Sequence, residues 1–189
     1  MVDRATAVLA IDPGPRTSGL VIYDLPRNGG PGSVRHSVKA ASWADVVREV
    51  RWLRGPYRTG ELIIACERVT PGQSSWSLVQ TSEVIGRLMQ LVEDLGDNAR
   101  LAVPLSLLSR REVLMALRVS GPGAKRDSLV RACLMEMHGG ERAVSIGTKR
   151  APGPLHGVAS HAWAALAVAC AHRILQRETA ERAAAHITQ

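Results

Sequence analysis

The stretch Ala7-Val-Leu-Ala-Ile-Asp-Pro-Gly-Pro-Arg-Thr-Ser-Gly19, continued by Leu20-Val-Ile-Tyr-Asp24, decides the fold. Its first apolar run ends at one carboxylate, Asp12, and a Pro-Gly turn leads into a second apolar run. Apolar runs bounded by turn residues are typical of β-strands, so two strands are expected, at 6–12 and 17–24, joined as a hairpin. A carboxylate at the end of a buried strand is costly unless it is hydrogen-bonded, paired or bound to a cation. Asp12 is therefore either a turn residue before Pro-Gly or a functional carboxylate.

Composition indicates an ordinary globular protein, with 46% hydrophobic and 22% charged residues. The length of 189 residues suits one domain with a full core, so residues 1–189 are expected to form a single domain. No apolar run approaches the ~20 residues of a membrane helix, and the first residues lack a signal-peptide pattern, so a cytoplasmic protein is expected. Three cysteines without Cys-x-x-Cys spacing are expected to be core residues in a reducing compartment: Cys66, Cys133 and Cys170.

The charge is strongly basic. Lys and Arg number 24 against 17 acidic residues, a net charge of +7, and arginine dominates. Arginine suits phosphate well, so the excess indicates either a nucleic-acid-binding surface or a solvated surface encoded by a GC-rich genome. The candidates for contacts with a DNA backbone are Arg110, Arg111, Arg118, Lys125, Arg126, Lys149 and Arg150. Each of them is equally compatible with an ordinary solvated face.

The rest of the chain alternates helical and strand patterns. Further strands are expected at 33–39, 61–66 and 99–103, the last stopped by Pro104. Helices are expected at 42–53, 74–95, 106–117, 124–137 and from 160 onward. This order predicts an α/β fold, a mixed β-sheet of about five strands with helices on both faces. The helix at 74–95 has more apolar residues than one sheet face needs, and Gly86 within it suggests a close neighbour.

A second carboxylate, Glu67, directly follows the expected strand 61–66. If that strand and the first are parallel neighbours, Asp12 and Glu67 emerge at the same edge of the sheet, where open α/β folds place their sites. Two close carboxylates repel each other and require a divalent cation. The alternative for Glu67 is an ion pair with Arg68 or another arginine.

An imidazole is the third candidate. Ser160 is a good N-cap for the last helix, which places His161 in the first turn. Small residues along this helix allow it to lie close to a sheet, and His161 would then face the strand ends. The alternative is a hydrogen-bonded, partly buried histidine. His172 lies about three turns further along and cannot share the site.

Four segments, Ala10–Gly19, Leu62–Val69, Gly123–Val130 and Ser160–His172, follow one another as the motifs of a known family do. The first is Ile-Asp-Pro-Gly with Thr and Gly soon after, and the second is an apolar strand ending in Glu. The third loosely matches Ala/Ser-Lys-x-x-Val, and the fourth is similar to a final Asp-Ala-x-Asp-Ala-Leu-Ala helix. The chain thus resembles the RuvC-type Holliday junction resolvases, most closely their divergent phage-borne members.

The resemblance implies an RNase H-like fold and a homodimeric endonuclease that resolves four-way DNA junctions in recombination, repair or phage DNA processing. It also implies a bacterial cell or a phage-infected host. The implied cofactor is a pair of divalent ions, Mg²⁺ or Mn²⁺. Asp12 would bridge the ions, Glu67 would hold the ion beside the attacking water, and His161 would complete one shell. Lys125 would meet the scissile phosphate, although it can equally be a solvated lysine at a helix start.

One position departs from the family. The final helix usually offers two acidic ligands three residues apart, whereas this chain has His161 and Ala164. Three alternatives follow for the missing ligand. Substrate phosphate and water complete the coordination shell, an acid from elsewhere in the chain enters it, or activity is weakened. A branched-DNA-binding protein with weak or no cleavage and a flap or fork nuclease therefore stay open. Because imidazole favours borderline metals, stronger activity with Mn²⁺ than with Mg²⁺ is expected.

Overall fold

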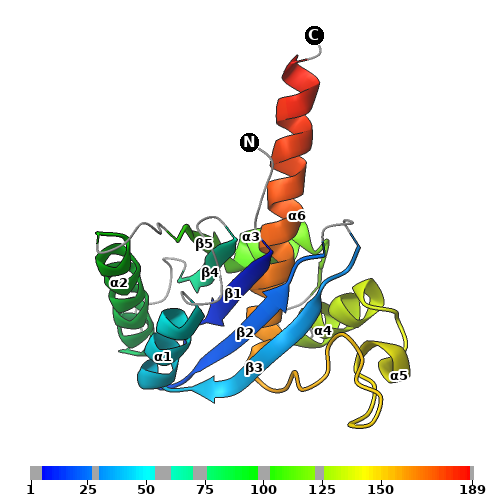
Figure 1. Ribbon diagram of the computed structural model, residues 1–189, viewed down its shortest axis with the longest axis horizontal. Helices are drawn as coiled ribbons and strands as arrows, with labels where there is room; N and C mark the ends of the chain where they lie inside the picture. The colour runs from blue at the N-terminus through cyan, green and yellow to red at the C-terminus, as the bar shows by residue number, and fades with distance from the viewer. Residues whose placement is uncertain are drawn as a thin grey trace.

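The computed structural model describes residues 6–26, 30–53, 61–69, 76–97, 103–121 and 126–187. Its strands are β1 (Ala7–Asp12), β2 (Ser18–Asp24), β3 (Ser33–Ala41), β4 (Leu62–Arg68) and β5 (Leu105–Ser109). Its helices are α1 (Trp43–Leu53), α2 (Trp76–Asp97), α3 (Arg110–Ala116), α4 (Arg126–Met137), α5 (Arg142–Ser145) and α6 (Ala162–Ile187). Figure 1 shows α1 and α2 on one side of the sheet and α6 crossing the other side.

The five strands form one mixed sheet in the order β3-β2-β1-β4-β5. β1 pairs antiparallel with β2, and the register places Asp12 opposite Gly19. On its other side β1 pairs parallel with β4, which pairs parallel with β5. β1 is therefore the central strand, with β2 and β3 on one side and β4 and β5 on the other. This arrangement confirms the predicted RNase H-like α/β sheet of about five strands with helices on both faces.

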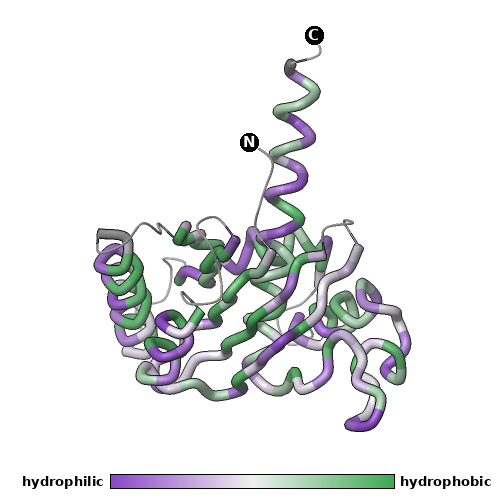
Figure 2. The backbone as a smooth tube through the Cα atoms, in the orientation of Figure 1, coloured by the Kyte–Doolittle hydropathy of each residue, from purple (hydrophilic) through white to green (hydrophobic). Residues whose placement is uncertain are grey.

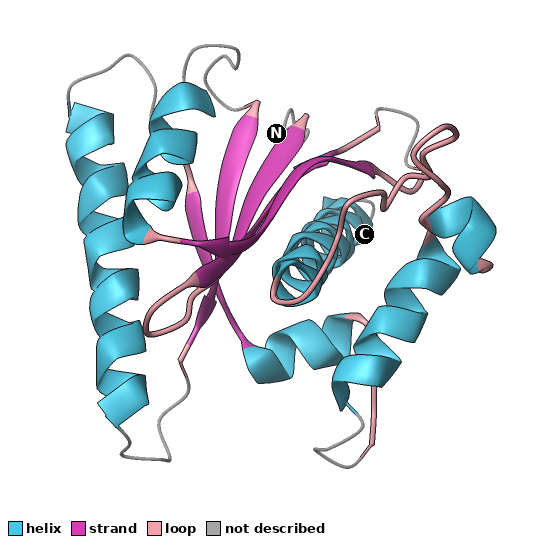
Figure 3. Ribbon diagram, turned by 90° about the horizontal axis from the view of Figure 1, so that it is seen from below, coloured by secondary structure: helices cyan, strands magenta, loops and turns pink. Residues whose placement is uncertain are grey.

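Helices cover both faces of the sheet, which explains the unbroken apolar run of β1. Successive residues of a strand point to opposite faces. Leu9 and Ile11 belong to a core shared with α1 and α2, whereas Val8 and Ala10 belong to a core shared with α3, α4 and α6. Figure 3 shows these helical layers on either side of the strands. A polar side chain is accommodated only where the strand leaves both cores, at Asp12.

The fifth strand lies later in the chain than predicted. Residues 99–102 of the predicted strand lie outside the described residues, and the observed strand Leu105–Ser109 begins after Pro104. Pro104 does not end the pairing, because its carbonyl accepts a hydrogen bond from the N–H of Ile64 (2.9 Å). The predicted start of the helix at 106 is therefore wrong.

Ser109 sets the true start of α3. Its Oγ accepts a hydrogen bond from the N–H of Glu112 (3.2 Å), and its own N–H donates to the Glu112 carboxylate (2.7 Å). This reciprocal pair is a capping box, and the sequence Ser109-Arg-Arg-Glu112 carries its signature. The cap places Arg110 as the first residue of the helix. Within the described residues, the other predicted strands and helices are confirmed to within two residues at their ends.

α6 passes through two environments. Its first half lies on the sheet, where Ala165, Leu166 and Ala169 are completely buried. Most residues from Gln176 to His186 are exposed, and Figures 1 and 2 show this half projecting from the body with hydrophilic residues along it. In the part of the chain that the structure describes, no helix combines the length and the apolar character needed to cross a membrane.

The outer face of α2 carries exposed apolar side chains. Leu88 faces the sheet and is 1% exposed, whereas Trp76, Val79 and Met89 are 73%, 47% and 47% exposed. A Cβ added at Gly86 would meet no atom of the described chain within 4 Å. The close neighbour predicted at this glycine is therefore not found among the described residues.

Candidate active site

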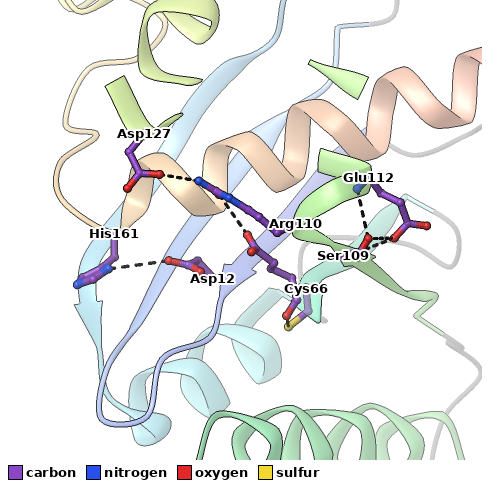
Figure 4. Close-up of polar contacts among 8 residues, drawn as sticks. Asp12, Cys66, Ser109, Arg110, Glu112, Asp127 and His161 are labelled. Atoms are coloured by element: carbon purple, nitrogen blue, oxygen red, sulfur yellow. Dashed lines mark hydrogen bonds and ion pairs between the residues drawn. The ribbon is translucent and has the colours of Figure 1, made fainter. Parts of the chain in front are cut away.

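A cavity of about 280 Å³ opens where β1 and β4 end and α6 begins. The side chains that give it its chemistry come from separate parts of the chain: Asp12, Glu67, Arg110, Asp127 and His161. Figure 4 shows Arg110 reaching toward Asp127 on one side of the site and His161 reaching toward Asp12 on the other. Val130, Trp163 and Ala164 also line the cavity. The structure thus brings together the three predicted metal ligands, Asp12, Glu67 and His161.

Parallel pairing of β1 and β4 places Asp12 beside Glu67. The register pairs Ile11 with Cys66, so the next residues of the two strands emerge together at one sheet edge, as predicted. Burial raises the pKa of Asp12 to about 6 and the pKa of Glu67 to about 7. Arg110 opposes both shifts, while nearby acids add to them. The ionised forms of both carboxylates are therefore costly here, and the charge of Arg110 offsets only part of that cost.

His161 lies directly before α6 rather than in its first turn. Its carbonyl accepts hydrogen bonds from the N–H groups of Ala164 (3.1 Å) and Ala165 (3.3 Å). Ser160, the predicted N-cap, has a φ of 48°, so the prediction that it caps the helix is wrong. The imidazole is nevertheless at the site: Nδ1 of His161 is 3.9 Å from Oδ2 of Asp12, and the side chain is 60% exposed.

Gly19 allows the start of α6 to approach the sheet. It lies opposite Asp12 in the hairpin. A Cβ at this position would overlap the carbonyl oxygen of His161 and lie 3.0 Å from its Cβ. The glycine is therefore required by the close approach of another backbone, and it fixes the place of His161 relative to Asp12.

Arg110 connects two carboxylates inside the cavity. Its Nη1 is 3.5 Å from Oε2 of Glu67, and its Nη2 is 2.6 Å from Oδ1 of Asp127. The side chain of this predicted DNA contact is only 29% exposed, so in this structure it serves the site itself. Sequence patterns do not single out Asp127, because an acid in the first turn of a helix is ordinarily explained by the helix dipole. Its only sequence signal is its place two residues after Lys125.

The donor set fits a divalent ion. Carboxylate oxygens and an imidazole nitrogen are suitable ligands for Mg²⁺ or Mn²⁺. The raised pKa values of Asp12 and Glu67 indicate that their anions require additional positive charge, which an ion would supply. Within the described ranges, no three His, Cys, Asp or Glu side chains are already grouped closely enough to hold an ion. The guanidinium of Arg110 provides the positive charge at the site instead.

The other predicted DNA contacts that the structure describes do not line the cavity. Five of them are exposed: Arg111, Arg118, Arg126, Lys149 and Arg150. Lys149 and Arg150 lie in a loop closed by a bridge between Gly147 and Pro152. Lys125, the predicted phosphate contact, lies outside the described residues. The three cysteines are free, and two of them are buried as predicted.

Comparison with known proteins gives matches in structure only: no protein-family model and no curated protein sequence matches the chain. The structure of Thermus thermophilus RuvC in complex with Holliday junction substrate is 19% identical, with a TM-score of 0.61 over 92% of this chain and 96% of that chain. A second Thermus thermophilus RuvC structure is 20% identical, with a TM-score of 0.60 over the same shares. The yeast mitochondrial Holliday junction resolvase Ydc2 is 12% identical, with a TM-score of 0.52 over 92% of this chain and 82% of that chain. The chain therefore has the RNase H-like fold of the RuvC-type Holliday junction resolvases.

Proposed function

We propose that the chain is a divalent-metal-dependent endonuclease that resolves four-way DNA junctions by paired phosphodiester hydrolysis, in recombination, repair or phage DNA processing. The observation that carries this proposal is the meeting of Asp12, Glu67 and His161 in one cavity at the sheet edge. The shared fold adds support, because one structure with that fold was determined with a Holliday junction substrate. The net charge of +7 suits a nucleic-acid partner.

Each side chain has a role that its place supports. Asp12, the last residue of β1, would hold both ions, Glu67 would hold one, and His161 would add a nitrogen ligand from the exposed side. Bound ions of this kind activate water and stabilise the leaving oxygen. Asp12 and Glu67 can hold a cation only when ionised, so their raised pKa values predict metal binding that weakens below about pH 7.

DNA would be held by exposed basic residues on α3, on α4 and in the loops that follow them. Arg111 and Arg126 adjoin Arg110 and Asp127 in sequence, so they lie beside the site on α3 and α4. We propose phosphate contacts for them, for Arg118 and for the loop residues Lys149 and Arg150. Contacts of this kind are independent of base sequence and weaken with rising salt. Lys125, which precedes Arg126, is proposed to meet the scissile phosphate.

Cleavage of a labelled synthetic four-way junction tests the proposal. Wild type and Asp12→Asn are incubated with Mn²⁺, Mg²⁺ or EDTA, beside duplex, flap, fork and single-strand controls. We expect paired symmetric nicks in the junction, faster with Mn²⁺ than with Mg²⁺, and none with EDTA or with Asp12→Asn. Preferential cutting of flaps or forks would show that these, and not four-way junctions, are the substrate. Cutting that survives both EDTA and Asp12→Asn would show that the cavity is not the active site.

A second candidate is a protein that binds branched DNA without cutting it. Ala164 lines the cavity where the family's motif has an acid, and Arg110 already pairs with two of the acids that are present. Tight junction binding without nicks in any metal would favour this function. Cleavage gained by Ala164→Asp would then show that the missing carboxylate is the reason.

A homodimer is proposed on the outer face of α2, where Trp76, Val79 and Met89 are exposed and Gly86 leaves open space. An apolar face on a helix favours contact with a second copy of the chain, and a glycine permits close helix approach. The two copies would supply the two cuts of a junction.

We expect Met89→Glu to convert a dimer into a monomer, because a charge would be buried in that contact. Molar mass measured by light scattering after size exclusion checks this. The matched control is Met115→Glu on α3, where the methionine is 66% exposed and outside the proposed contact. A wild-type monomer, or a Met89→Glu dimer, would contradict the proposal.

A further inference from the structure

The cavity contains an acid that the family's motifs do not provide. Ala164, at the position where the final helix usually has its second carboxylate, lines the cavity and offers no ligand. Asp127 lines the same cavity from α4. Three carboxylates and one imidazole therefore line the cavity, with one carboxylate from α4 rather than α6, although they are not yet grouped closely enough to hold an ion.

The contacts of Asp127 tie it to the proposed metal ligands. One guanidinium, that of Arg110, lies 2.6 Å from Oδ1 of Asp127 and 3.5 Å from Oε2 of Glu67. Each carboxylate lies against a different terminal nitrogen of this guanidinium. The guanidinium of Arg110 is thus a cation of the chain itself that lies between the two carboxylates.

Electrostatics agrees with this geometry. Burial is the main reason for the raised pKa of Asp12 and of Glu67, and the charge of Asp127 adds to both shifts. Asp127 therefore acts on the same small volume as the other two acids. Its side chain is 91% exposed, so it can turn toward an ion without losing buried contacts.

Stabilisation of the helix dipole is the ordinary role of an acid in the first turn of a helix. That role requires no particular partner. Asp127 instead pairs with an arginine that also reaches Glu67, which directs it into the cavity.

We infer that Asp127 is a metal ligand of this chain, replacing the carboxylate that Ala164 cannot supply, and that Arg110 holds Asp127 and Glu67 together until a divalent ion takes its place. The inference rests on the proposed function for the existence of a metal site. It predicts that ion binding releases Arg110, whose guanidinium is then available to a DNA phosphate.

Calorimetric titration of Mn²⁺ into the DNA-free full chain tests the inference, with Mn²⁺ paramagnetic resonance as a second readout. Asp127→Asn keeps the shape of the side chain and should weaken Mn²⁺ binding at least about tenfold. The double variant Asp127→Asn with Ala164→Asp should recover most of this loss. Arg110→Gln should bind Mn²⁺ more tightly than wild type, because the competing cation is gone. The control is Asp94→Asn, an exposed acid on α2, which should bind as wild type does.

The outcomes separate this inference from the proposed function. Wild-type Mn²⁺ affinity in Asp127→Asn overturns the ligand role, even if wild type resolves junctions. Unchanged or weaker binding in Arg110→Gln overturns the role given to Arg110. Weakened binding in Asp127→Asn that Ala164→Asp restores supports the ligand role even if no DNA is cut. Absence of Mn²⁺ binding by wild type overturns the inference and the metal site alike.

Discussion

Asp12→Asn should abolish junction cleavage and yet, at about pH 8 in EDTA, unfold at a higher temperature than wild type. The same burial that would favour cation binding at Asp12 makes its ionised form costly when no cation is present. Asparagine keeps the shape of the side chain and carries no charge. Loss of activity and gain of stability are thus expected from one substitution.

The sign follows from proton binding. The pKa of Asp12 is about 6 in the folded chain and 3.8 ordinarily, so between these values the folded state holds more protons than the unfolded state. Stability contributed by the neutral carboxyl is present below about pH 4 and is lost as the pH rises through about 6. The advantage of Asp12→Asn should therefore be absent in acid and complete above about pH 7.

The size of the effect follows from the shift. A change of about two pKa units corresponds to about 3 kcal/mol. The side chain is 23% exposed, and solvent reduces this value, so we expect about 2 kcal/mol, or roughly 4–8 °C in melting temperature.

Thermal unfolding followed by circular dichroism at several pH values measures the stability effect. Asp94→Asn, an exposed acid on α2, is the control and should not change the melting temperature. Saturating Mn²⁺ should raise the melting temperature of wild type and not that of Asp12→Asn. Equal melting temperatures of the two proteins in EDTA at about pH 8 would show that Asp12 carries no burial cost.

Gly19→Ala should damage the site without touching any ligand. The new Cβ would overlap the carbonyl oxygen of His161, so the start of α6 must move away from Asp12. Overpacking of this kind costs about 1–3 kcal/mol. A displacement of about 1 Å at a catalytic group can reduce the rate about a hundredfold. We therefore expect a lower melting temperature and at least a tenfold loss of cleavage.

Gly86→Ala, compared with its parent in the Met89→Glu background where the proposed α2 contact is removed, is the matched control for unfolding. A Cβ at Gly86 meets no described atom within 4 Å, and alanine is the better helix former by about 0.5–1 kcal/mol. Its melting temperature should hold or rise. If Gly19→Ala melts and cleaves as wild type does, the close approach at Gly19 does not position His161.

The two carboxylates at the strand ends are the part of the site that strand patterns in the sequence predict. Asp12 and Glu67 each follow an apolar run, so their strands and their common edge are readable from periodicity. Their adjacency needs the parallel pairing of β1 with β4, which the structure supplies. His161 is predicted as a site residue although its helix begins one residue after it.

Other features depend on contacts between distant segments. Pro104 reads as a strand terminator, but it accepts a hydrogen bond from β4 before β5 begins, which moves the fifth strand and α3 along the chain. Asp127 becomes part of the site only through Arg110, 17 residues away in sequence. Local propensity has no signal for such a pairing. The capping box at Ser109, in contrast, was present in the sequence as Ser-x-x-Glu.

The burial of the first half of α6 has a consequence for synthesis. The cavity unites Asp12 with His161, so it closes through contacts of long sequence separation, which form late in folding. A growing chain that has reached β5 has made Asp12 and Glu67 but neither the imidazole nor the helix that covers the second face of the sheet. Such a nascent chain cannot assemble the site. The proposed cleavage of DNA would thereby be impossible until α6 has left the ribosome and docked.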